Sequence, residues 1–172
     1  MQLGVGEGDH PVLVLPAACR KASMYKHIML PIDGSELSRK AEKECVAFAK
    51  SAGARVTAIH VVSHFYLHYQ PWAAPRSMHA KIEKEHEEEA RQTAEQMLAT
   101  LMKRIKAEGV ACESLVVVGD HPFEEIIDNA EKRKCDLIMM ASHGHKGLNA
   151  VLLGSETVKV LTHSKIPVLI VR

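Results

Sequence analysis

The residues with the clearest chemical potential lie in one loop near the carboxyl end of the chain. Residues 141–144 (Ala-Ser-His-Gly) directly follow the apolar run 137–140, and nine residues later come Gly154 and Ser155. A strand that enters a glycine-bearing loop and then a helix beginning with serine brings together backbone N–H groups, a hydroxyl and the positive end of a helix dipole. These groups bind phosphate, so the pattern indicates a nucleotide site. A plain strand-to-helix connection is the alternative interpretation.

Charged and titratable side chains in and after this loop add further candidates. Lys146 could neutralise a phosphate as a mobile point charge, and His143 or His145 could donate a proton. Glu156, one residue into the helix, suits the helix dipole but repels a phosphate, so Mg²⁺ between ligand and protein is a candidate cofactor. Gly147 is assigned a conformational role in the same site.

The elements that must position this loop alternate along the chain from Met24 onward. Nearly continuous apolar runs predict short strands, and apolar residues at helical spacing predict the helices between them. Strands are expected at 27–32, 55–62, 114–118, 136–141 and 167–171, and helices after Ser35, through 82–105, from Pro122 and from Ser155. Five strands of this kind indicate an α/β fold: a parallel sheet with helices on both faces, Rossmann-like, with ligands at the carboxyl ends of the strands.

Composition bounds the class of protein. A chain of 172 residues with 47% hydrophobic and 25% charged residues can form one domain with a proper core. Basic and acidic residues are interleaved and leave a formal charge of +1, so we expect no nucleic-acid partner. The four cysteines lie far apart without a CxxC pair, which favours reduced thiols over disulfides or a zinc site. We expect a cytoplasmic protein without a membrane partner.

Residues 1–23 differ from the rest of the chain. They place glycines and prolines around one short apolar run, and their basic residues follow that run, whereas a secretory signal has them before it. We expect 1–23 to be a flexible leader or start-site extension, with the domain at 24–172. A regulatory tail is the alternative.

Several stretches occur in the order found in a known family. They are 25–35 (YKHIMLPIDGS), 58–62 (AIHVV), Gly119-Asp120, the loop 141–155 and the carboxyl-terminal PVLIVR. In these stretches the segment 24–172 resembles the universal stress protein family, whose ATP-binding members carry Gly, two residues, Gly, nine residues, Gly and then Ser or Thr. This chain keeps Gly144, Gly154 and Ser155 but has Ala141 at the first glycine. The extra methyl group excludes a ligand only if φ must be positive there or the phosphate must touch Cα.

The resemblance implies an adenine nucleotide alpha hydrolase-like fold that binds an adenine nucleotide, here ATP. It implies that Asp33 hydrogen-bonds the ribose hydroxyls, that Pro31 and Ile32 line the base, and that the Val61 backbone holds adenine. A carboxylate just past a strand can accept two hydroxyl protons, and apolar walls suit a flat purine. Met140, at the end of the apolar run, is assigned to the same site. An ordinary Asp-Gly turn at Asp33 is the alternative.

The last expected strand, 167–171, predicts a homodimer. The strand order implied by the family places it at the outside of the sheet, where an uncovered apolar edge would invite aggregation. Pairing with the same strand of a second copy across a two-fold axis would cover both edges. Coverage by a helix or by the leader of the same chain is the alternative.

Three functions of different classes stay open. The first is a nucleotide-sensing stress-response module, with or without slow ATP hydrolysis; the second is a dimeric interaction module of the same fold without a nucleotide; the third is a dedicated ATP-using enzyme. An enzyme needs a positioned general base and a substrate pocket beyond the phosphates, and the chain offers only Asp33 and the loop histidines. We therefore favour the first.

Overall fold

Strands and helices alternate along the chain in the computed structural model, which describes residues 24–64, 76–142 and 153–172. The leader 1–23 and its expected flexibility lie outside the described residues. The elements are β1 (His27–Pro31), α1 (Glu36–Ala52), β2 (Arg55–Val62), α2 (Arg76–Ala107), β3 (Cys112–Val118), α3 (Pro122–Lys132), β4 (Leu137–Ala141), α4 (Ser155–His163) and β5 (Val168–Val171).

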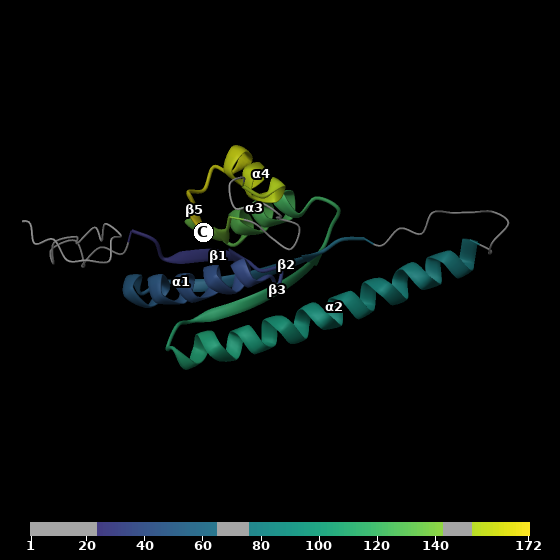
Figure 1. The fold of residues 1–172 in the computed structure, drawn as a ribbon, viewed down its shortest axis with the longest axis horizontal. Helices are drawn as coiled ribbons and strands as arrows, with labels where there is room; N and C mark the ends of the chain where they lie inside the picture. Colours follow the sequence, from purple (N-terminus) through teal and green to yellow (C-terminus); the bar gives the residue numbers. More distant parts are fainter. Residues whose placement is uncertain (1–23, 65–75, 143–152) are drawn as a thin grey trace, which may run out of the picture.

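The strands form a parallel five-stranded sheet in the order β3-β2-β1-β4-β5. From β1 the chain proceeds outward to β2 and β3, then crosses to the other side of β1 and adds β4 and β5 (Figure 1). The predicted α/β Rossmann-like class is confirmed. The direction of winding reverses between β1 and β4, and ligands of such sheets bind at the carboxyl ends of the strands at this point.

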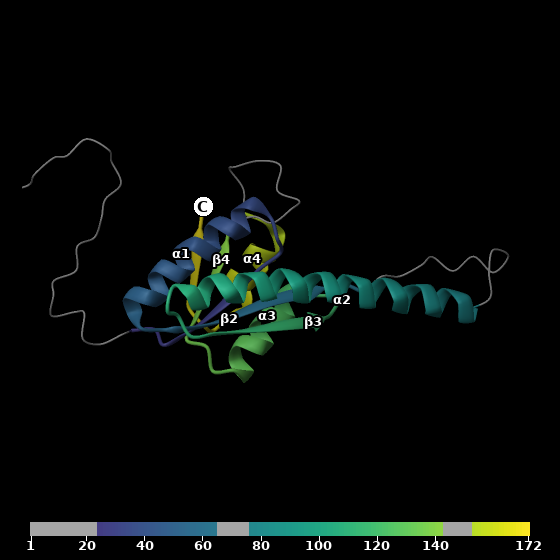
Figure 2. The same cartoon turned by 90° about the horizontal axis from the view of Figure 1, so that it is seen from below.

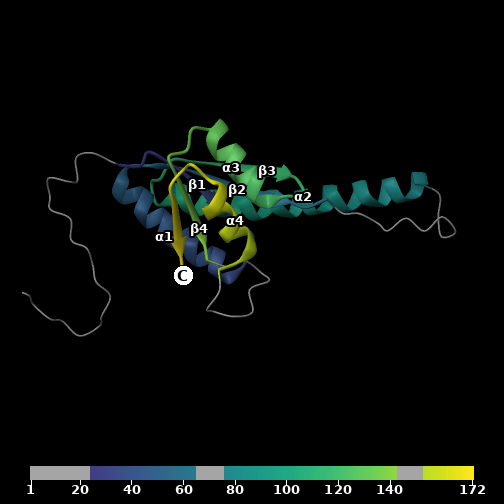
Figure 3. The ribbon, with the colours of Figure 1, turned by 90° about the horizontal axis from the view of Figure 1, so that it is seen from above.

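Helices cover both faces of the sheet. α1 and α2 lie on one face, and α3 and α4 lie on the other (Figures 2 and 3). Successive β1 residues serve the two faces in turn: Ile28 and Leu30 belong to the core with α1 and α2, whereas Met29 belongs to the core with α3 and α4. All three are fully buried, each contributing about 1.5–3 kcal/mol of hydrophobic stabilisation.

The ends of α1 and α3 follow from local chemistry, as expected. Ser35 is the N-cap of α1 and accepts a hydrogen bond from the Ser38 N–H at 3.1 Å, and Gly53 ends the helix in the left-handed conformation at φ 64°. Pro122 begins α3, where its missing N–H costs nothing.

Some strand bounds differ from expectation for identifiable reasons. β3 begins at Cys112, before the expected 114–118, because Glu113 pairs in register with Thr57 and hydrogen-bonds it through its side chain. β4 begins after Asp136, whose carboxylate instead accepts the backbone N–H groups of Lys26 and His27 at 2.8 and 3.0 Å. β5 begins at Val168, just after the expected start at 167.

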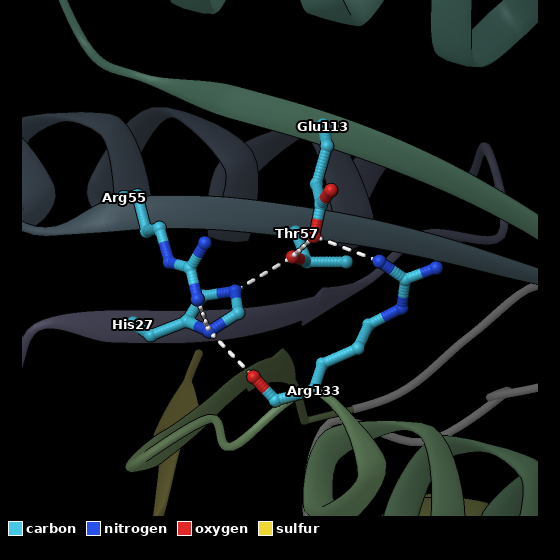
Figure 4. A network of polar contacts seen from close by, with 5 residues as sticks. All are labelled: His27, Arg55, Thr57, Glu113 and Arg133. Carbon is cyan, nitrogen blue, oxygen red and sulfur yellow. Dashed lines mark hydrogen bonds and ion pairs between the residues drawn. The ribbon is translucent and has the colours of Figure 1, made fainter.

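A polar network centred on the buried side chains of His27 and Thr57 joins the amino ends of β1, β2 and β3 (Figure 4). The Thr57 hydroxyl donates to the Glu113 carboxylate at 2.8 Å, so it accepts from His27 Nε2–H at 2.7 Å. His27 Nδ1 lies 3.0 Å from Arg55 Nη2 and 3.1 Å from the Arg133 carbonyl oxygen. Because a guanidinium only donates and a carbonyl only accepts, Nδ1 serves one of them at a time. The neutral ring pairs with Arg55, and the protonated ring with Arg133.

His27 is therefore expected to make stability depend on pH. Burial first, and then the Arg55 charge, hold the pKa of His27 below its ordinary 6.5, although Arg133, Glu113 and Asp136 act in the opposite direction. Between these two pKa values, His27 is protonated in the unfolded chain but neutral in the folded chain. The free energy of unfolding should therefore fall as pH drops from about 6.5 toward the pKa of the folded state, by at most about 1.4 kcal/mol per pH unit.

Urea unfolding at several pH values between about 7.5 and 5.5 measures this dependence. The variant His27→Gln, which can still donate to Thr57 but does not titrate, should show a flatter profile. Equal slopes for the two proteins would show that His27 does not carry the effect.

Candidate functional site

A cleft of about 510 Å³ opens at the carboxyl ends of β1, β2 and β4. It lies at the point where the winding of the sheet reverses, as the topology requires of a ligand site. Every candidate site residue within the described ranges lines it: Pro31, Ile32, Asp33, Val61, Met140, Ala141, Gly154, Ser155 and Glu156. Chain segments more than a hundred residues apart thus meet in one place.

Part of the predicted site lies outside the described residues: Gly144, Lys146 and Gly147, with His143 and His145. The cleft also has polar lining residues that sequence reasoning did not assign to it, namely Ser38, His60, Ser63 and Thr157. Their positions in the sequence already hint that they lie near the cleft. Ser38 is one turn from the Ser35 cap, and His60 and Ser63 lie on either side of the last residues of β2. Only the folded register shows that they reach the cleft.

The backbone at the end of β1 is tightly anchored. The Ile32 N–H donates to the Ile59 carbonyl at 2.8 Å, and His60 Nδ1 lies 2.6 Å from the Ile32 carbonyl oxygen. The Asp33 N–H donates to Ser38 Oγ at 3.3 Å, and Asp33 Oδ1 accepts the Ser35 N–H at 3.0 Å. The Asp-Gly turn weighed as an alternative is therefore present, and it holds Asp33 at the cleft.

The opposite wall is formed where β4 leads toward α4. Gly154 N–H donates to the Ser142 carbonyl at 2.8 Å, and the Thr157 hydroxyl donates to the Ala141 carbonyl at 3.1 Å. These bonds hold the end of β4 against the start of α4 and bring the first residue of α4, Ser155, to the cleft. Gly154, at φ −61° and ψ 150°, has a conformation open to any residue, so close approach of a ligand is a better reason for a glycine here than backbone strain.

The carboxylate of Glu156 has two protein partners. Its Oε2 accepts the Phe123 N–H at the start of α3 at 3.0 Å, and its Oε1 pairs with Lys159 Nζ at 2.8 Å. The positive end of the α3 dipole and the ammonium both offset its charge. Repulsion of a phosphate by Glu156 is therefore weaker than the sequence alone indicated. For the same reason, a cation such as Mg²⁺ is less needed at this side chain.

Within residues 24–64, 76–142 and 153–172, no group of three or more His, Cys, Asp or Glu side chains is arranged to hold a metal ion. None of the helices in those ranges combines the length and apolar character needed to cross a membrane.

Ala141 takes the place of the first glycine of the resembled pattern without backbone strain. It is the last residue of β4, and in the described part of the chain Lys134, at φ 57°, is the one non-glycine residue with positive φ. Since φ is not positive at Ala141, glycine is not needed there for conformation.

The variant Ala141→Gly should accordingly change the affinity for ATP, the nucleotide that the resemblance implies, by only about threefold or less, which is under 1 kcal/mol. Calorimetric titration measures this, with Ala58→Gly in β2 as a matched control for the cost of glycine in a buried strand. Appearance of strong binding in Ala141→Gly alone would instead show that the methyl group blocks the site.

Comparison with known proteins gives one consistent result. The sequence model of the universal stress protein family matches residues 24–172. Universal stress protein MJ0531 of Methanocaldococcus jannaschii is 34% identical over 150 residues, which cover 87% of this chain and 84% of that protein. The solved structure of MJ0577, from the same organism, has a TM-score of 0.72 at 32% identity and covers 86% of this chain and 96% of its own.

Two further solved structures share the fold at lower identity. One is a universal stress protein in complex with cAMP, with a TM-score of 0.60 at 24% identity over 86% of this chain and 97% of that one. The other is the universal stress protein from Archaeoglobus fulgidus in complex with dAMP, with a TM-score of 0.56 at 17% identity over 86% of this chain and 98% of that one.

Proposed function

The chain belongs to the universal stress protein family, and on that premise we propose that it binds ATP in the cleft between β1 and β4 and acts as a nucleotide-dependent stress-response regulator. One observation carries the proposal: Asp33 after β1, Val61 on β2 and Ser155 at the start of α4 line the same cleft. A ribose acceptor, a strand backbone for the base and a helix N-terminus in one pocket of about 510 Å³ are the parts that a nucleotide needs.

Each part of the nucleotide contacts the part of the cleft whose chemistry suits it. The base lies against Pro31 and Ile32 and is held by the Val61 backbone, and the ribose hydroxyls donate to Asp33. The phosphates lie at Gly154 and Ser155. The N-cap Gly154 offers no side chain to cap α4, so the first N–H groups of this helix suit an anion.

The relatives support the adenine part of the proposal, since two proteins of this fold were solved with cAMP and dAMP. The triphosphate is our extension, based on the loop pattern from Ala141 to Ser155. Mg²⁺ belongs with the phosphates rather than with Glu156, whose carboxylate is engaged by Lys159 and the start of α3. The unpaired thiols of Cys45, Cys112 and Cys135 favour a reducing compartment, in keeping with a cytoplasmic location.

A second copy of the chain is the proposed partner at the β5 edge. β5 is an outer strand of the sheet, and Val168, Leu169 and Ile170 are each half-buried. Beside it, the exposed face of α4 presents Val158 and Leu161, which are 45% and 40% exposed. Pairing of two β5 strands about a two-fold axis would cover this apolar edge in both copies.

Mass spectrometry of small molecules released from the gently purified protein tests the proposal against the alternative of a dimeric module without a nucleotide. We expect an adenine nucleotide, at up to one per chain. Release of no nucleotide, together with no uptake of added ATP, favours the alternative and identifies Ala141 as the substitution to examine first.

A further inference from the structure

His60 is a polar residue of the cleft to which the proposed ligand contacts give no role. Its Nδ1 lies 2.6 Å from the Ile32 carbonyl oxygen. Because a carbonyl oxygen only accepts, Nδ1 carries the proton of this bond. The tautomer of the neutral ring is thereby fixed, with Nε2 as the acceptor nitrogen.

The bonded carbonyl belongs to the peptide unit that joins Ile32 to Asp33. Both polar groups of this peptide are engaged by side chains: the carbonyl accepts from His60 on β2, and the N–H donates to Ser38 Oγ on α1 at 3.3 Å. Ile32 is also held through its own N–H, which donates to Ile59 at 2.8 Å. With both groups bonded, the peptide plane resists rotation, and this plane sets the direction in which Asp33 leaves the strand.

We infer that His60 is a positioning residue, which aims the Asp33 carboxylate and thereby gives the cleft its preference for a ribose with both hydroxyls. This inference rests on the proposed function and deepens it. A histidine that only fills space would contribute equally to binding of nucleotides with and without ribose hydroxyls. The two roles therefore differ in selectivity, which can be measured.

Three variants separate the hydrogen bond from the volume of the ring. His60→Asn carries an amide nitrogen at the place of Nδ1, His60→Gln moves that nitrogen one bond farther out, and His60→Leu has no donor. For ATP, we expect His60→Asn to bind within about threefold of the unmodified protein, and the other two to bind about tenfold more weakly. For 2′,3′-dideoxy-ATP, which lacks both hydroxyls, all four proteins should have similar affinities.

A nucleotide-free measurement completes the test. Nitrogen NMR of the unmodified protein should show the Nδ1–H tautomer at His60, and hydrogen exchange at the Asp33 amide should be faster in His60→Leu than in His60→Asn. Equal losses for ATP and dideoxy-ATP, an Nε2–H tautomer, or unchanged exchange would each overturn the positioning role. Failure of the unmodified protein to bind any nucleotide would overturn the proposed function, while the NMR results would still decide whether His60 holds the peptide.

Discussion

Replacing Asp33 with alanine should weaken ATP binding by about tenfold to a hundredfold. A hydrogen bond to a charged group contributes about 1.5–3 kcal/mol, and each 1.4 kcal/mol is a factor of ten in affinity. The carboxylate lies at the cleft, where Oδ1 already accepts the Ser35 N–H at 3.0 Å. Alanine removes both the ribose acceptor and this turn contact, and each loss should lower the affinity for ATP. Calorimetric titration with ATP gives the measurement.

Asp33→Asn separates those two losses. Asparagine keeps an oxygen for the Ser35 N–H but replaces the second acceptor and the charge with an amide, so a loss of about tenfold is expected. Asp128→Asn is the matched control, because Asp128 is an exposed residue of α3 that pairs only loosely with Lys132 at 3.9 Å. If Asp33→Ala binds ATP within about threefold of the unmodified protein, the assignment of Asp33 to the ribose is wrong.

Introducing proline at Ile170 should convert the proposed dimer to a monomer. The carbonyls of Pro167 and Val171 accept from the N–H groups of Ile138 and Ser142, so Val168 and Ile170 direct their backbone groups to the edge of β5 opposite β4. Proline deletes the Ile170 N–H that a second β5 would need, and edge strands tolerate proline.

Sedimentation at about 10 μM, a concentration at which a stable two-fold dimer persists, measures the change. Asp128→Asn should remain dimeric, because α3 lies away from β5 along the sheet. A monomeric unmodified protein, or an Ile170→Pro variant that remains a dimer, would rule out this interface.

The sequence predicted the elements of the fold because their signals are local. The apolar runs, the Ser35 cap, Gly53 and Pro122 all act within one turn of the residues that they affect. The candidate residues in the described ranges line one cleft for a related reason, since each lies at a strand or helix end that a parallel sheet brings to one edge. Resemblance to a family pattern added the proposed roles of Asp33 and Val61, which local chemistry alone left open.

Contacts that depend on strand register and on packing could not be predicted from the sequence. The bond from His60 to Ile32 depends on the pairing of Pro31 with Ile59, which no single strand encodes. The sequence alone predicts that Glu156 repels a phosphate, whereas in the fold its carboxylate accepts the N–H of Phe123, 33 positions earlier, and pairs with Lys159. The polar network around His27 likewise exists because three strands align their amino ends.

Equilibrium dialysis of labelled ATP, with Mg²⁺ present, against nucleotide-free protein tests the central claim most directly. The account predicts saturable retention of one ATP per chain, displaced by unlabelled AMP and weakened in Asp33→Ala but unchanged in Asp128→Asn. Absence of retention at millimolar ATP by a protein that is folded and dimeric would contradict it.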